Sequence, residues 1–80
     1  MTDEDIRAAV LRSLIKVAPE ADPATIAGDV NLRDQLDIDS MDFLNFVISL
    51  HDHVGLDIPE ADYGKLSTLD ACVEYLRTAK

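Results

Sequence analysis

The sequence lacks the features that mark secreted, membrane and disulfide-rich proteins. Cys72 is the single cysteine among the 80 residues, so no internal disulfide and no multi-cysteine metal site can form. No apolar run approaches the ~18 residues of a membrane-spanning helix. The acidic N-terminus, MTDEDIRAAV, also lacks the apolar segment of a signal peptide. We therefore expect a single domain over residues 1–80 in the cytoplasm.

Basic residues are scarce. Seven Lys and Arg stand against 16 Asp and Glu, giving a net charge of -9, and no Lys or Arg lies between Arg33 and Lys65. Binding of nucleic acid requires clustered Lys and Arg, so nucleic acid is excluded as a partner. An acidic surface attracts basic partners and speeds their encounter. A general excess of solubilising charge explains the same composition equally well.

Local signals predict one long helix and a long connection in the first half of the chain. Thr2 and Asp5 resemble a capping box at the start of a helix over residues 3–17. Residues 18–39 are too many for a structureless loop in a compact domain. A helical turn is expected after Asp22. Five apolar residues are expected to pin the connection to the core: Ile26, Val30, Leu32, Leu36 and Ile38.

The second half carries three more helical segments and no segment that alternates like a strand. Asp39 is a good N-cap for a helix that ends near Gly55. A short helical segment is expected over residues 59–63. Ser67 and Asp70 resemble a capping box for the last helix. The predicted fold is all-α, a small antiparallel bundle of three main helices plus one short helix.

The helix after Asp39 has two apolar faces on a helical wheel. One face is assigned to the core and holds Phe43, Phe46, Val47, Leu50 and Val54. Met41, Leu44 and Ile48 lie on nearly the opposite side. Beside them lie Asn45, Ser49 and Asp52. This second stripe is either covered by the long connection or exposed, and an exposed apolar stripe with an acidic rim favours a partner site.

Ser40 stands at the start of that helix, in the stretch LDIDSMDFLNFV. A phosphate esterified there would meet the positive end of the helix dipole, although Asp-Ser alone favours ordinary capping. His51, the nearer candidate base, lies about 16 Å away along a continuous helix, and His53 lies farther still. No Gly-x-Ser-x-Gly elbow is present, and two histidines spaced two apart make a poor metal site. We therefore expect no catalytic activity and no metal.

The chain as a whole resembles the acyl carrier protein family. The likeness rests on the leading helix, the long loop, DSM opening a helix, the stop at Gly55, the stretch LDIPEADYGKLSTLDACVEYL and the acidity. It implies that Ser40 bears 4'-phosphopantetheine, added from coenzyme A by a phosphopantetheinyl transferase. The terminal thiol of that arm would hold an acyl group as a thioester. The protein would be a monomer that acts as a carrier for partner enzymes.

The resemblance also implies which residues meet those partners. The helix after Asp39 would be the recognition helix, and Asp39 would assist the transferase. The docking residues would be Asp39, Met41, Asp42, Leu44, Ile48 and Asp52. They would face basic surfaces on enzymes that activate or transfer acyl or aminoacyl groups.

The chain departs from the family pattern at several positions. Asp37 lies where many members have glycine, and Asn45 and His51 lie where carriers of fatty acid biosynthesis are usually acidic. Phe43 and Phe46 are bulky and predict a small or absent acyl cavity. These departures favour a dedicated lipid or secondary-metabolite pathway. An aminoacyl or peptidyl carrier, including the D-alanyl type, stays open, as does an acidic interaction module without a prosthetic group.

Overall fold

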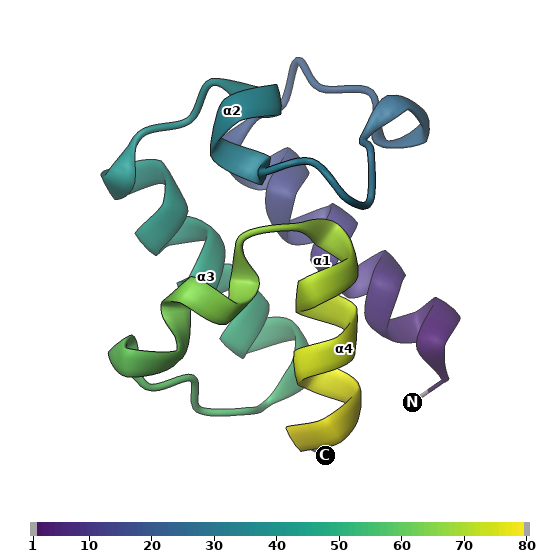
Figure 1. The fold of residues 1–80 in the computed structure, drawn as a ribbon, viewed down its shortest axis with the longest axis vertical. Helices are drawn as coiled ribbons and strands as arrows, with labels where there is room; N and C mark the ends of the chain where they lie inside the picture. The colour runs from purple at the N-terminus through teal and green to yellow at the C-terminus, as the bar shows by residue number, and fades with distance from the viewer. Residues whose placement is uncertain (1, 80) are drawn as a thin grey trace.

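The computed structural model describes residues 2–79. These residues form helices and no strand, which confirms the predicted all-α class (Figure 1). The helical segments are α1 (Asp3–Val17), the 3-10 helix η1 (Pro23–Thr25), α2 (Leu32–Leu36), α3 (Ser40–Val54), the 3-10 helix η2 (Glu60–Leu66) and α4 (Leu69–Ala79). In Figure 1, α1 runs upward and packs against α3 and α4, which both run downward. α2 lies across the upper end of this bundle.

Local side chains begin and end the two longest helices as predicted. At α1, Asp5 N–H donates to Thr2 Oγ1 and Thr2 N–H donates to Asp5 Oδ2, both at 3.2 Å. At α3, Asp42 N–H donates to Asp39 Oδ1 at 2.9 Å and Asp39 N–H donates to Asp42 Oδ2 at 3.3 Å. Gly55 ends α3 with φ of 69°, a left-handed conformation that glycine adopts without a steric penalty.

The predicted start of α4 is wrong by one residue. Ala71 N–H donates to Thr68 Oγ1 at 3.0 Å, so Thr68 caps the helix in place of Ser67. The reason is that η2 runs beyond the predicted Tyr63 to Leu66, and Ser67 follows it with helical angles. An N-cap needs a non-helical backbone, which Ser67 therefore does not offer.

The long connection holds more structure than the sequence predicted. Asp22 caps η1 as expected, with its Oδ1 accepting from Ala24 N–H at 3.0 Å. The short helix α2 was not predicted. Its N-cap, Asn31, accepts through Oδ1 from the backbone N–H groups of Arg33 and Asp34. The Gln35 amide of α2 then binds the backbone N–H and C=O of Ala27, each at 2.9 Å, and so closes the loop before it.

Most of the predicted anchors of the connection reach the core. Leu32 is fully buried, Ile26 and Ile38 are nearly so, and the partly buried Leu36 packs against the core. The assignment of Val30 is wrong, since its side chain is 42% exposed. Val30 lies in a bend just before α2, and its carbonyl is held by Gln35 Nε2 at 2.9 Å, which leaves the side chain on the outer side.

The core lies where α1, α3 and α4 meet. Its fully buried members include Val10, Leu14, Phe46, Leu50, Leu66, Leu69, Cys72 and Leu76. Cys72 donates its thiol to the carbonyl of Leu66 at 3.4 Å, and burial raises the pKa of that thiol to about 12. A thiol with so high a pKa is a poor nucleophile, which fits a small core residue.

Candidate functional site

Ser40 is the first residue of α3, and its side chain is exposed. The preceding residue, Asp39, already receives the N–H of Asp42 and fills the N-cap position. The hydroxyl of Ser40 is therefore not needed to cap the helix. The capping role of the Asp-Ser pair is therefore filled by Asp39, as the sequence predicted.

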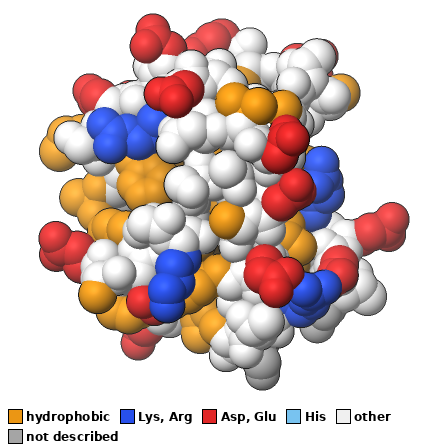
Figure 2. Space-filling model, viewed as in Figure 1, with side chains coloured by type: hydrophobic (Ala, Val, Ile, Leu, Met, Phe, Trp, Pro, Cys, Tyr) orange, Lys and Arg blue, Asp and Glu red, His pale blue; other side chains and the backbone are white. Residues whose placement is uncertain are grey.

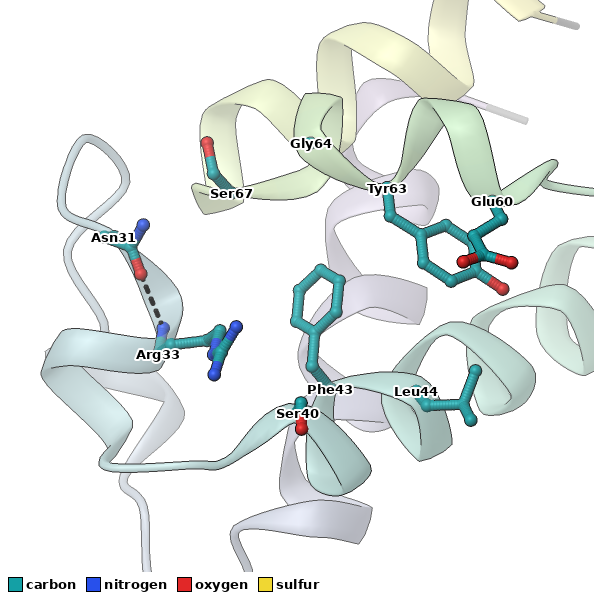
Figure 3. Close-up of a pocket in the computed structure, with 9 residues that line it drawn as sticks. All are labelled: Asn31, Arg33, Ser40, Phe43, Leu44, Glu60, Tyr63, Gly64 and Ser67. Atoms are coloured by element: carbon teal, nitrogen blue, oxygen red, sulfur yellow. Dashed lines mark hydrogen bonds between the residues drawn. The ribbon is translucent and has the colours of Figure 1, made fainter.

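Ser40 opens onto a pocket of about 520 Å³ between α2, α3 and η2 (Figure 3). Its wall includes Arg33 from α2, Ser40, Phe43 and Leu44 from α3, and Glu60 and Tyr63 from η2. Pockets for small molecules have volumes of roughly 300–1,000 Å³. The space beside Ser40 is therefore large enough to hold part of an attached group.

Contacts between distant parts of the chain hold the two walls of this pocket together. Leu32 N–H, at the start of α2, donates to the carbonyl of Ser67 just after η2 at 2.8 Å. On the other side, the Tyr75 hydroxyl of α4 donates to Asp62 of η2 at 2.7 Å. This hydrogen bond lowers the pKa of the Asp62 carboxyl and raises the pKa of Tyr75. Lys65 Nζ lies 3.3 Å from the same carboxylate. The wall formed by η2 is thus fixed to α4.

The two phenylalanines leave more room than their bulk led us to expect. Phe46 is fully buried in the core. Phe43 is half-buried, with its ring centre 5.7 Å from that of Phe46 and 6.4 Å from that of Tyr63. The ring of Phe43 is tilted relative to both of these rings. It forms a wall of the pocket and does not fill it.

The second apolar stripe of α3 is exposed. Met41 is 64% exposed, Leu44 39% and Ile48 51%. The long connection therefore does not cover them. Hydrophobic side chains also gather on the left of the face shown in Figure 2, over α3 and η2. Asp52 is exposed near the stripe.

The sequence placed Ser49 beside the exposed stripe, and this prediction is wrong. Ser49 is 7% exposed, so it does not line the outer surface. Its carbonyl accepts from His53 Nδ1 at 2.8 Å, and that nitrogen lies 3.4 Å from Ser13 Oγ of α1. Ser49 thus lies toward the side of α3 that packs on α1.

The side chains of both histidines of α3 are hydrogen-bonded to backbone carbonyls. His51 Nδ1 donates to the carbonyl of Leu56 at 2.9 Å, and His53 Nδ1 donates to that of Ser49. The bond of His51 satisfies a carbonyl just beyond the end of α3, and the bond of His53 goes to a carbonyl within the helix. Within residues 2–79, no group of three or more His, Cys, Asp or Glu is placed to hold a metal ion. Over the same residues, no helix is both long enough and apolar enough to span a membrane.

Comparison with known proteins identifies the family. The sequence profile described as "Phosphopantetheine attachment site" matches residues 8–76. The chain belongs to the acyl carrier protein family. It is 36% identical to the acyl carrier protein of Lactobacillus johnsonii over 78 residues, which are 98% of this chain and 96% of the relative. The identity to the acyl carrier protein of Lactobacillus acidophilus is 31% over the same shares of the two chains.

Solved structures agree with the sequence comparison. The acyl carrier protein from Enterococcus faecalis superimposes with a TM-score of 0.83 at 26% identity, over all of both chains. Acyl carrier proteins bear 4'-phosphopantetheine on a serine and are carriers, not enzymes. Membership confirms the expected cofactor and the expected lack of catalysis. It also implies a phosphopantetheinyl transferase and acyl-handling enzymes as partners.

Sequence reasoning missed several residues that surround Ser40. Arg33, Glu60 and Tyr63 line the pocket but lie 7 to 23 positions away from Ser40 in the chain. One signal pointed to Arg33, because it is the last basic residue before the acidic window. No signal in the sequence pointed to Glu60 or Tyr63, since only the fold brings η2 opposite α2.

Proposed function

We propose that Ser40 bears the 4'-phosphopantetheine and that residues 1–80 act as one monomeric carrier domain. The observation that carries this proposal is the position of Ser40. It is exposed at the start of a 15-residue helix, free of the capping role and next to a pocket of about 520 Å³. A phosphate on this hydroxyl meets the N-terminal end of α3, where the helix dipole favours negative charge. The residues present therefore fit the group.

The protein's own residues hold and display the attached arm. When bound, the group supplies a thiol that holds an acyl cargo as a thioester. The reciprocal hydrogen bonds of Asp39 and Asp42 fix the first turn of α3 and so fix the attachment point. The walls from α2 and η2 shelter one side of Ser40, while its exposed side is left open to an incoming enzyme. The tether raises the effective concentration of the cargo at each partner.

The docking surface that we propose is the exposed stripe of α3 with its acidic rim. Met41, Leu44 and Ile48 supply the apolar contact. The acidic rim consists of Asp39, Asp42 and Asp52. A second hollow of about 440 Å³ lies beside Ile48, between α3 and residues 57–63, and would accept an apolar side chain of the partner. Enzymes with a basic rim around an apolar patch fit this surface.

We propose that the carrier serves a dedicated lipid or secondary-metabolite pathway. Asn45 and His51 interrupt the acidic surface of α3, which distinguishes it from carriers of fatty acid biosynthesis. An aminoacyl or peptidyl cargo is the second candidate, and one observation favours it. Glu60 lines the same pocket as Ser40, and its carboxylate would attract an ammonium group of the cargo.

The attachment site is tested by incubation with coenzyme A and a broad-specificity phosphopantetheinyl transferase. Mass spectrometry should find one added phosphopantetheine on the wild type and on Ser67→Ala, a control serine beside the same pocket. Ser40→Ala should fold and gain no mass. An unmodified wild type, or a modified Ser40→Ala variant, would show that the proposal is wrong.

A further inference from the structure

Arg33 is the basic side chain on the wall of the pocket that also contains Ser40. We infer that the Arg33 guanidinium binds the phosphodiester once the prosthetic arm is attached, and so positions the first part of the arm over the pocket. This inference rests on the proposed attachment at Ser40. It concerns the carrier in its unloaded form, before any cargo is present.

The backbone at Arg33 is fixed while its side chain is available. Arg33 N–H donates to Asn31 Oδ1 at 2.9 Å, which holds the residue in the first turn of α2. In Figure 3 the guanidinium projects from α2 toward α3, on the side where Ser40 and Phe43 lie. Three other basic side chains, those of Arg7, Lys65 and Arg77, lie within 4.0 Å of a carboxylate, while Arg12 and Lys16 on α1 lie near none among the described residues. No such ion pair is found for Arg33 within residues 2–79.

The negative charge around Ser40 also favours binding of the phosphodiester by Arg33. A phosphodiester at Ser40 adds a negative charge to a stretch, residues 34–64, that contains no Lys or Arg. Asp39 and Asp42 flank it and already accept backbone N–H groups of the first turn. Like charges so close repel, and Arg33 is the basic residue placed to offset them. The planar guanidinium also matches the paired oxygens of a phosphate, with which it can form two parallel hydrogen bonds.

The composition of the pocket favours the phosphodiester over an anionic group on the cargo. Glu60 lines the pocket together with Arg33 and Ser40. Its carboxylate would repel a carboxylate of the cargo that entered the pocket. The phosphodiester stays at the mouth because it is bonded to Ser40. Arg33 therefore has one constant anionic partner there, whatever the cargo is.

The test compares the unloaded carrier before and after modification, with 31P NMR as the main measurement. The variants are Arg33→Gln, Arg33→Lys and Arg12→Gln; Arg12 is exposed on α1 and its loss changes the net charge equally. Mass spectrometry first checks that each variant carries the group on Ser40. In wild type and Arg12→Gln we expect the same 31P resonance, with a shift on addition of salt. In Arg33→Gln we expect a displaced, narrower resonance that salt moves little, and in Arg33→Lys an intermediate one.

Thermal stability provides an independent measurement. Modification should lower the Tm of Arg33→Gln by about 2–4 °C relative to its effect on wild type, the size expected for a lost exposed ion pair in a domain of this length. Identical 31P resonances in modified wild type and Arg33→Gln would overturn the inference and leave the attachment at Ser40 intact. An effect of Arg33→Gln that appears only with a carboxylate-bearing cargo would also overturn it. Failure to modify Ser40 in the wild type would instead contradict the proposed function.

Discussion

The two faces of α3 carry similar apolar residues but differ in their exposure to water. Phe46 and Leu50 are fully buried against the rest of the bundle, while Leu44 and Ile48 on the other side are exposed. Burial of a leucine side chain contributes about 1.5–3 kcal/mol to folding. An exposed leucine contributes little until a partner covers it. The same helix thus holds the fold together with one face and leaves the other face, beside Ser40, exposed, where we propose that partner enzymes dock.

The largest expected effect is the loss of a leucine from the buried face. Leu50→Ala should lower the free energy of unfolding by about 2–5 kcal/mol, because it removes buried methyl groups and leaves a cavity. Domains of this size are often stable by only about 5–15 kcal/mol. Urea denaturation followed by circular dichroism measures the loss. A loss below about 1 kcal/mol would mean that Leu50 does not belong to the core.

The matched change on the exposed face should separate binding from folding. Leu44→Ala and Ile48→Ala should each cost less than about 1 kcal/mol of stability, since water already reaches these side chains. Both should slow modification of Ser40 by the transferase, by roughly fivefold to thirtyfold if each contributes about 1–2 kcal/mol to docking. The rate is measured as kcat/KM for phosphopantetheine transfer. The comparison of the two faces fails if Leu44→Ala unfolds the domain as readily as Leu50→Ala.

Features set by neighbours in the chain could be predicted from the sequence. The capping pairs at Thr2 and Asp39 and the stop at Gly55 depend on side chains within a few residues, so their patterns are visible. The two faces of α3 follow from the helical period alone. Ser67 and Thr68 show the limit of this reasoning, because the choice between two adjacent capping residues depended on where η2 ended.

Features set by tertiary contacts could not be predicted. The helix α2 has five residues, too few to show a period, and its loop is closed by the side chain of Gln35. Asp37 ends α2 with φ of 53°, a left-handed conformation that aspartate tolerates better than most residues and that glycine adopts freely. This explains why the family resemblance pointed to a glycine there. The pocket forms only where the fold brings α2 and η2 opposite each other, an arrangement held in part by the hydrogen bond from Leu32 N–H to the carbonyl of Ser67, 35 positions farther along the chain.

The smallest expected effect concerns the acidic rim of the exposed face. Asp52 is exposed in the last turns of α3, where a negative charge opposes the helix dipole. Asp52→Asn should therefore leave the stability unchanged or raise it by a few tenths of a kcal/mol. The same change should slow transfer to Ser40 by about twofold in low salt, because an exposed charge contributes about 0.2–1 kcal/mol to a contact.

Salt separates this electrostatic effect from a loss of contact. The Debye length falls from about 10 Å at 0.1 M salt to about 3 Å at 1 M, so exposed charges no longer act across the gap between the proteins. The difference between Asp52→Asn and wild type should then disappear, while the effect of Ile48→Ala should remain. Glu20→Gln, an exposed acid in the connection after α1, serves as the charge-matched control and should transfer at the wild-type rate. If Glu20→Gln and Asp52→Asn slow transfer equally, then net charge and not the rim of α3 attracts the transferase, and the exposed face acts through its apolar residues alone.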